Sequence, residues 1–135
     1  MSKKILLVED KMSSLNTTFK LANLRKFQGS LVIRSVPRSQ DVNYDTLKDD
    51  YDLVFVDITL AERSQKNGYG VLKDILAHDY FPKNKLIVLT GNMEIEESLK
   101  QNGLPLDLEI LRKPVSFPQL EKILINHLSP TLNEA

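Results

Sequence analysis

Hydrophobic and polar positions follow a repeating order along the chain, in which short apolar runs alternate with stretches of helical spacing. The apolar runs cover residues 5–8, 31–36, 53–56, 86–89 and 108–111. Three of the runs are apolar without interruption, which is typical of strands buried on both faces and of parallel sheets covered by helices. We therefore predict five strands in a parallel sheet.

The segments between these runs place hydrophobic residues on one face of a helix. In the first segment Leu15, Phe19 and Ala22 share a face, and Ser13 or Ser14 offers a capping hydroxyl. Further helices are predicted at residues 44–49, 68–78, from about 95 to Gly103, and from 116 to 128. The last of these begins with Ser116-Phe117-Pro118-Gln119, which matches a capping box.

Five strand–helix units in succession predict a doubly wound α/β fold, with helices on both faces of the sheet and right-handed crossovers. The 135 residues suit one domain. We expect this domain to span residues 1–128 and residues 129–135 to form a C-terminal tail or the start of a linker.

Composition and charge exclude several classes of function. Lys and Arg number 18 against 18 Asp and Glu, without the basic cluster that duplex DNA binding requires. There is no cysteine, which excludes disulfide scaffolds, thiolate metal sites and cysteine nucleophiles. The first apolar run is too short for a signal peptide, and a membrane span needs about 20 residues. We expect a cytoplasmic protein that binds neither nucleic acid nor membrane.

Polar residues follow the apolar runs at the edge where such sheets bind ligands, beyond the carboxyl ends of the strands. These residues are Glu9, Asp10, Asp57, Thr90 and Lys113. Each alone could be a helix cap, a turn residue or a strand end. Together, converging carboxylates repel one another and favour a hard divalent cation such as Mg²⁺. A carboxylate acceptor, a metal, an ammonium group and a hydroxyl are the parts that phosphoryl transfer to an aspartate needs.

This constellation resembles the receiver domains of two-component response regulators. The resemblance spans residues 3–128 and rests on ILLVED at 5–10, DLVFVD at 52–57, IVLTG at 87–91 and LRKPV at 111–115. It implies a flavodoxin-like (βα)₅ fold with strand order 2-1-3-4-5. It also implies a signalling switch that a histidine kinase or histidine phosphotransfer protein phosphorylates, and that then changes its binding to a downstream effector protein or output domain.

The resemblance assigns a metal site to four residues. Asp57 would be the phosphoacceptor and a Mg²⁺ ligand, and Asp10 would bind the ion directly. Glu9 would act largely through water, and the backbone carbonyl of Thr59 would be a further ligand.

The resemblance also assigns residues that handle the phosphoryl group. Thr90 would swing toward it as the switch hydroxyl, Lys113 would pair with its oxygens, and the bond from Lys113 to Pro114 would be cis. Thr59 and Asn92 would tune how fast water removes the phosphate.

The loop after Asp57 departs from the family pattern. It reads ITLAERSQKNG, with Leu60-Ala61 where the family commonly has Met-Pro, and Gly68 falls about three residues later than the usual glycine. The inserted residues 62–66 are polar, and we expect them to be exposed. They are either a tolerated insertion or a change that affects kinase docking or phosphate hydrolysis.

The second departure is Ile110, at a position where many receivers carry a Tyr or Phe that rotates inward with the switch hydroxyl. Signalling would then rely on Thr90 and backbone shifts, or the output surface works differently. That surface would include Glu94, Glu97 and Glu109, together with residues 104–106 as either a partner contact or a packed loop. His78 and His127 are expected to be surface or partly packed residues outside the site.

Three functions remain open from the sequence. The first is a switch phosphorylated at Asp57 that is not an enzyme beyond its own phosphorylation and dephosphorylation. The second is a pseudo-receiver, a protein-binding module that is never phosphorylated. The third is a phosphohydrolase with an aspartyl-phosphate intermediate, although such enzymes usually carry an aspartate where this chain has Thr59.

Overall fold

The computed structural model describes residues 3–9, 12–59 and 64–128, without the side chains of residues 12–14. Asp10, the capping hydroxyls of Ser13 and Ser14 and the predicted tail at 129–135 therefore lie outside what it describes. The strands are β1 (Lys4–Val8), β2 (Val32–Val36), β3 (Leu53–Asp57), β4 (Leu86–Thr90) and β5 (Glu109–Arg112). The α-helices are α1 (Met12–Phe27), α2 (Leu47–Asp50), α3 (Gly68–Ala77), α4 (Ile95–Gln101) and α5 (Phe117–Leu128). Short 3₁₀ turns, η1 (Ser39–Asp41), η2 (Tyr44–Thr46) and η3 (Lys83–Lys85), complete the described elements.

The described strands form one parallel sheet in the order β2-β1-β3-β4-β5, which confirms the predicted doubly wound topology. The chain begins in β1, moves outward to β2, and then returns past β1 to β3. This reversal of direction leaves a switch point between β1 and β3, where loops diverge and a ligand can enter. Val8 pairs with Val56, so the residue after β1 lies beside the last residue of β3.

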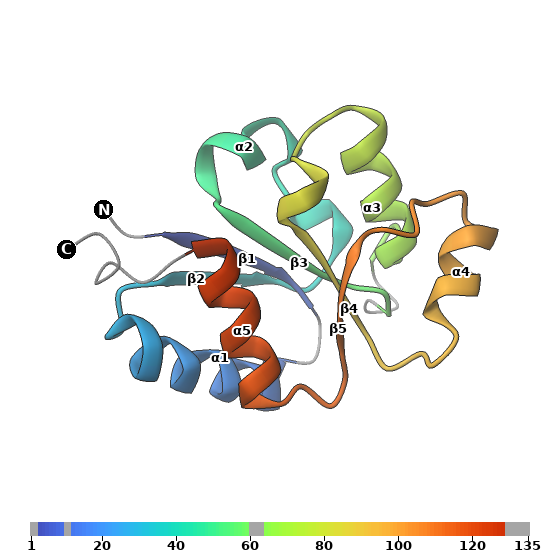
Figure 1. The fold of residues 1–135 in the computed structure, drawn as a ribbon. Helices are drawn as coiled ribbons and strands as arrows, with labels where there is room; N and C mark the ends of the chain where they lie inside the picture. Colours follow the sequence, from blue (N-terminus) through green and yellow to red (C-terminus); the bar gives the residue numbers. More distant parts are fainter. Residues whose placement is uncertain (1–2, 10–11, 60–63, 129–135) are drawn as a thin grey trace.

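Helices cover both faces of the sheet (Figure 1). Helices α1 and α5 pack on one face, and α2, α3 and α4 lie on the other. Alternate strand residues contribute to opposite clusters, so Leu6 and Val8 lie in one core and Ile5 and Leu7 in the other. Because both faces are buried, the central strands need apolar residues at every position, which explains their uninterrupted sequences.

An aromatic contact joins α1 to the centre of the sheet. Phe19 and Phe55 are both fully buried, and their rings meet edge to face with centroids 5.1 Å apart. This geometry is favourable for aromatic quadrupoles and adds to the burial of two large side chains.

The predicted element boundaries hold at the centre of the sheet and shift at its margins. The predicted helix at 44–49 is instead the 3₁₀ turn η2 followed by the single turn of α2, in which only Leu47 is buried. Strand β5 begins at Glu109, one residue later than predicted, because Leu108 packs into the core before the strand pairs with β4. Within the described segments, no helix combines the length and apolar character needed to cross a membrane.

We expect Phe55→Ala to destabilise the protein by about 3–5 kcal/mol, because it leaves a cavity between α1 and β3 and removes the ring contact with Phe19. Urea unfolding followed by circular dichroism measures the change. Leu24→Ala is the control, since Leu24 is 63% exposed and its truncation should cost within about 0.5 kcal/mol. Equal losses in the two variants would contradict this account of the core.

Candidate functional site

Two acidic side chains lie at the switch point of the sheet. Glu9 follows β1, where its amide donates to Val36 O at 2.9 Å, and its side chain is buried with 1% exposure. Asp57 ends β3 opposite Leu89 of β4 and is 3% exposed. Burial of two carboxylates is unfavourable unless a cation or hydrogen-bond donors compensate them.

Lys113 supplies that compensation from the end of β5. Its amide donates to Thr90 O at 2.8 Å, which fixes the start of the loop, and its bond to Pro114 is cis, as the resemblance implied. The Lys113 ammonium Nζ lies 2.5 Å from Asp57 Oδ2 and 2.9 Å from Glu9 Oε2. Three of the predicted site residues, from β1, β3 and β5, therefore meet in one ion cluster.

The described part of this cluster contains one ammonium group and two carboxyl groups. Burial alone would lower the pKa of the Lys113 amine, but hydrogen bonds to Asp57 and then Glu9, with the charges of both, outweigh it and raise the pKa. Lys113 therefore stays cationic at neutral pH. Among the described residues this ammonium group contacts both carboxyl groups, which holds the two acidic side chains side by side.

The chemistry of the donors fits a hard divalent cation. Glu9 and Asp57 offer carboxylate oxygens, and Mg²⁺ prefers one or two carboxylates together with water. Thr59 lies next to the cluster, and its amide donates to Asp57 Oδ1 at 2.9 Å. Within the described ranges no three Asp, Glu, His or Cys side chains converge as a metal cage. The third predicted carboxylate, Asp10, lies outside those ranges.

Thr90 lies at the same edge, but its hydroxyl is bonded to the loop that follows it. It ends β4 and is 3% exposed, and its Oγ1 accepts a hydrogen bond from the Asn92 amide at 3.0 Å. Among the described residues no hydrogen bond joins Thr90 to Asp57. The hydroxyl predicted to act as a switch is thus held by the loop that follows β4.

Gly68 allows α3 to begin directly against the acceptor strand. Its amide donates to Ile58 O at 2.9 Å. A Cβ at this position would lie 2.2 Å from Asp57 O and 2.4 Å from Ile58 Cα, closer than any side chain can approach backbone. The glycine that falls late in the sequence pattern therefore has a steric reason to be glycine.

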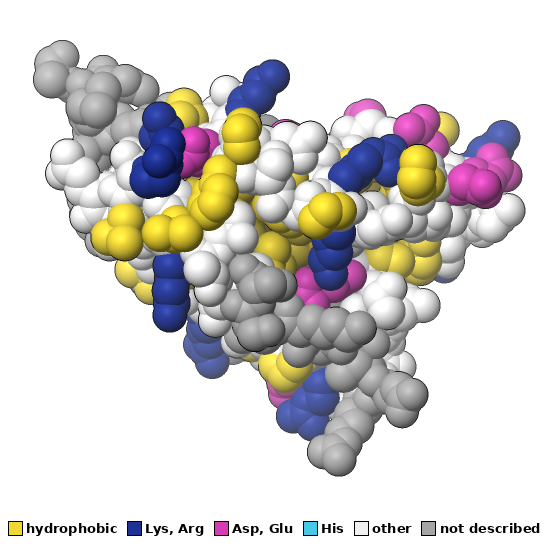
Figure 2. Space-filling view, turned by 90° about the horizontal axis from the view of Figure 1, so that it is seen from below, with side chains coloured by type: hydrophobic (Ala, Val, Ile, Leu, Met, Phe, Trp, Pro, Cys, Tyr) yellow, Lys and Arg dark blue, Asp and Glu magenta, His cyan; other side chains and the backbone are white. Residues whose placement is uncertain are grey.

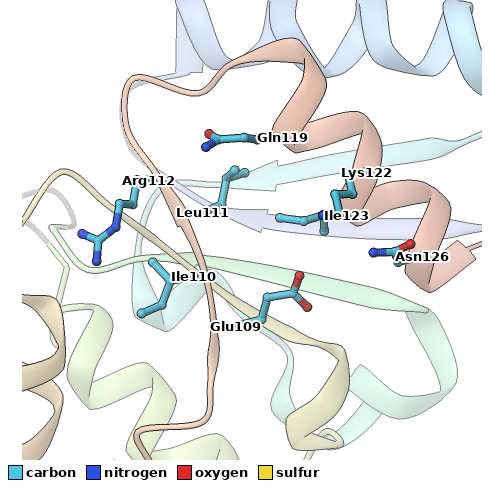
Figure 3. A pocket seen from close by; sticks show the side chains of 8 residues that line it. All are labelled: Glu109, Ile110, Leu111, Arg112, Gln119, Lys122, Ile123 and Asn126. Atoms are coloured by element: carbon cyan, nitrogen blue, oxygen red, sulfur yellow. The ribbon is translucent and has the colours of Figure 1, made fainter.

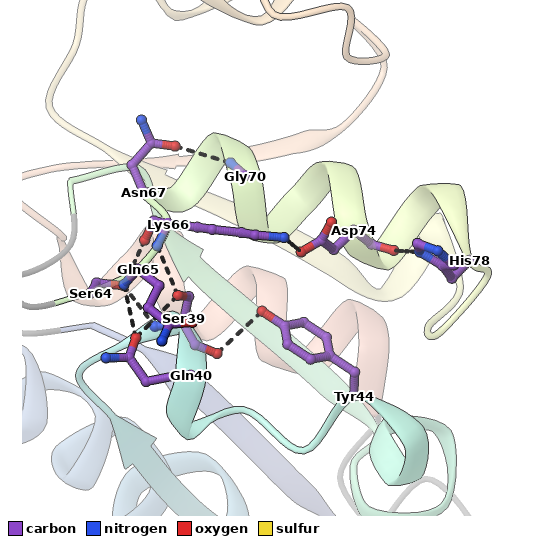
Figure 4. A network of polar contacts seen from close by, with 10 residues as sticks. All are labelled: Ser39, Gln40, Tyr44, Ser64, Gln65, Lys66, Asn67, Gly70, Asp74 and His78. Atoms are coloured by element: carbon purple, nitrogen blue, oxygen red, sulfur yellow. Dashed lines mark hydrogen bonds and ion pairs between the residues drawn. The ribbon is translucent and has the colours of Figure 1, made fainter.

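The end of the insertion after Asp57 docks on the loop that follows β2 (Figure 4). The Ser39 amide donates to Ser64 Oγ at 2.7 Å, and the Lys66 amide donates to Ser39 Oγ at 2.9 Å. The Gln65 amide donates to Gln40 Oε1 at 2.9 Å. Gln65 and Lys66 are exposed, as predicted for this segment. The sequence does not predict that the segment docks on the loop after β2, because no sequence pattern links two polar loops of this kind.

The predicted output surface is partly packed. Leu104 is buried, whereas Leu106 is 56% exposed. The start of the stretch at residues 104–106 therefore packs against the core, and its end is open to solvent. His127 Nε2 lies 2.6 Å from Glu109 Oε1, and the ring of His78 stacks on Tyr80 with centroids 5.1 Å apart. Among the described residues, neither histidine forms a hydrogen bond or ion pair with Glu9, Asp57 or Lys113, in keeping with the prediction.

The chain is similar to known proteins in its three-dimensional fold. No family model matches the chain, and no curated protein does. A receiver domain of a sensor histidine kinase from Pseudomonas aeruginosa PAO1 matches with a TM-score of 0.67 at 24% identity, over 94% of this chain and 98% of that one. That domain holds a magnesium ion in its active-site cleft.

Two further structures match over comparable lengths. A CheY-like receiver domain protein from Methanospirillum hungatei JF-1 has a TM-score of 0.68 and 21% identity, with 100% of both chains covered. A phosphorylated cyanobacterial phytochrome response regulator has a TM-score of 0.68 and 22% identity, with 96% of both chains covered. The chain therefore has the fold of response-regulator receiver domains over nearly its whole length.

We expect Gly68→Ala to destabilise the protein by at least about 2 kcal/mol, because the new methyl group overlaps the backbone of Asp57 and Ile58. Urea unfolding measures the loss. Gly91→Ala is the matched control: its Cβ would meet only Lys113 Cβ at 3.9 Å, so its stability should stay within about 1 kcal/mol. A Gly68→Ala variant as stable as the control would show that the site does not need this close approach.

Proposed function

We propose that this protein is a phosphoacceptor signalling switch, in which Asp57 receives a phosphoryl group from the phosphohistidine of a histidine kinase or phosphotransfer protein. The observation that carries the proposal is the position of Lys113 Nζ, which contacts Asp57 Oδ2 and Glu9 Oε2 at the switch point of the sheet. The receiver fold and the magnesium-containing relative support it.

The chemistry follows from the two oxygens of Asp57. A carboxylate oxygen attacks phosphorus, a new O–P bond forms, and the bond from phosphorus to the donor nitrogen breaks with its electron pair leaving on the donor. Asp57 Oδ1 is oriented by the Thr59 amide, and Oδ2 by Lys113. As charge moves onto the phosphoryl oxygens, Lys113 shifts to pair with them, so one ammonium group stabilises both the acceptor and the product.

A divalent cation belongs to this proposal. Asp57, Asp10, Glu9 and the carbonyl of Thr59 would hold it, with Glu9 acting through water. When bound, Mg²⁺ would neutralise charge shared between the carboxylates and the phosphoryl oxygens. The carboxyl groups of Glu9 and Asp57, which meet at Lys113, support this assignment because Mg²⁺ prefers carboxylate oxygens.

Phosphorylation would act as a signal and not as turnover of an external substrate. A phosphoryl group on Asp57 would shift an equilibrium between two arrangements of the neighbouring loops. The two arrangements would bind the downstream partner with different affinities, and this difference would be the signal. The partners are a phosphodonor protein and a downstream effector protein or output domain. The site of action is the cytoplasm, where ATP-dependent kinases work, and the proposal includes no direct contact with nucleic acid or membrane.

Incubation with Mg²⁺ and a small phosphodonor such as phosphoramidate should add the mass of one phosphoryl group to the intact protein. Asp57→Asn should abolish the gain, because the amide is not a nucleophile. Asp79→Asn is the control, since Asp79 is an exposed aspartate that pairs with Lys48 and is not part of the ion cluster, and it should behave as wild type.

A wild-type protein that never gains this mass would reject the switch and favour the pseudo-receiver. An Asp57→Asn variant that still gains it would place the acceptor elsewhere. Repeated turnover of a generic phosphate ester by the wild type would instead revive the phosphohydrolase.

Calorimetric titration with Mg²⁺ should separate metal binding from phosphoryl transfer. Asp57→Asn and Asp10→Asn should each weaken binding by at least about tenfold, because a direct ligand is lost. Lys113→Met should bind Mg²⁺ at least as tightly as wild type, since a competing cation is removed, yet accept phosphate poorly. Weaker Mg²⁺ binding by Lys113→Met would contradict the proposed electrostatics.

A further inference from the structure

Arg112 stands next to the site without belonging to the ion cluster. It ends β5, and its side chain is on the side of the strand turned away from α5, as is that of Ile110 (Figure 3). The intervening Leu111 belongs to the core beneath α1 and α5. Arg112 and Ile110 therefore lie on one face of β5, the face where the receiver resemblance implies an aromatic side chain that this chain lacks.

The guanidinium group of Arg112 reaches the loop between β4 and α4. Nη1 donates to Asn92 O at 3.1 Å, and Nη2 lies 3.9 Å from Glu96 Oε1 in the first turn of α4. A planar guanidinium can serve both partners at once because its donors point in fixed directions. The loop is thus anchored to β5 by a charged donor on a backbone carbonyl.

Asn92 connects this anchor to the switch hydroxyl. Its amide donates to Thr90 Oγ1 at 3.0 Å, its Oδ1 accepts from the Glu94 amide at 2.9 Å, and its Nδ2 donates to Ser98 Oγ at 2.9 Å. One residue therefore joins the end of β4 to helix α4. A rotation of the Thr90 side chain that carries Oγ1 away from the Asn92 amide would break this hydrogen bond.

We propose that Arg112 is a positioning residue that holds the β4–α4 loop, and with it Thr90, in the resting arrangement. The inference rests on the proposed function at Asp57 and names how this chain couples that site to β5 without an aromatic residue at 110. Phosphorylation draws Thr90 toward Asp57, Asn92 shifts with it, and the contact from Arg112 to Asn92 O is broken. Arg112 therefore stabilises the resting state selectively, which raises the cost of leaving it.

Two substitutions of Arg112 test this role with graded expectations. Arg112→Met keeps much of the side-chain length and removes every donor, whereas Arg112→Lys keeps one charged donor for Asn92 O. Lys122→Met is the control, because it removes a charge of the same sign from the exposed face of α5, where Lys122 forms no hydrogen bond or ion pair with the described residues of the β4–α4 loop.

The first measurement is amide hydrogen exchange of Asn92 and Glu94 in the protein without phosphodonor, by nuclear magnetic resonance. These two amides donate to Thr90 Oγ1 and Asn92 Oδ1, so they report the resting loop directly. Arg112→Met should exchange them roughly threefold to tenfold faster than wild type, with Arg112→Lys in between and Lys122→Met unchanged. Unchanged exchange in Arg112→Met would overturn the inference.

The second measurement is the rate of mass gain from phosphoramidate with Mg²⁺. Arg112→Met should accept the phosphoryl group about threefold to tenfold faster than wild type, because only the resting state loses a contact. A purely structural role would lower the melting temperature without this acceleration. If wild type accepts phosphate and Arg112→Met accepts it at the same rate or more slowly, the role of Arg112 is overturned and the proposed function stands. If wild type accepts no phosphate, both the proposed function and the role of Arg112 are overturned.

Discussion

The ion cluster of Lys113 with Asp57 and Glu9 sets the conditions that the surrounding structure has to meet. Two carboxylates with exposures of 1% and 3% are held beneath the loops by one ammonium group. Their burial is tolerable because Lys113 contacts both and the Thr59 amide satisfies Asp57 Oδ1. The cluster exists only if β1, β3 and β5 end at one edge, which the parallel order β2-β1-β3-β4-β5 ensures.

Other features of the site keep this cluster close to the sheet and accessible to a ligand. Gly68 lets α3 start against the backbone of Asp57, so the first turn of the helix lies next to the end of the acceptor strand. Among the described residues, two carboxylates and one ammonium group meet there, and carboxylate oxygens are ligands that suit a divalent cation. Two buried carboxyl groups are unfavourable as a purely structural element. They would suit the reversible phosphorylation proposed for Asp57.

The loops on either side of the cluster are fixed by polar contacts in place of apolar packing. Ser39 holds the end of the inserted loop (Figure 4), and Asn92 with Arg112 holds the loop after β4. In Figure 2, a dark blue basic side chain lies beside a magenta acidic one near the middle of the face seen from below. Hydrogen bonds at partly exposed positions contribute little free energy each, so such loops can rearrange while the two apolar cores remain intact.

The sequence by itself determined the elements that depend on local pattern. Uninterrupted apolar runs such as 53–56 identified buried parallel strands, and polar residues directly after them identified the ligand-binding edge, because both follow from backbone periodicity. The tertiary structure alone decided which of those residues touch. Lys113 and Glu9 are distant in the chain and meet only through strand order, the hydroxyl of Thr90 is engaged by Asn92, and Ser39 receives the inserted loop. Contacts between loops depend on side-chain geometry across the sheet edge, and no periodic pattern along the chain encodes it.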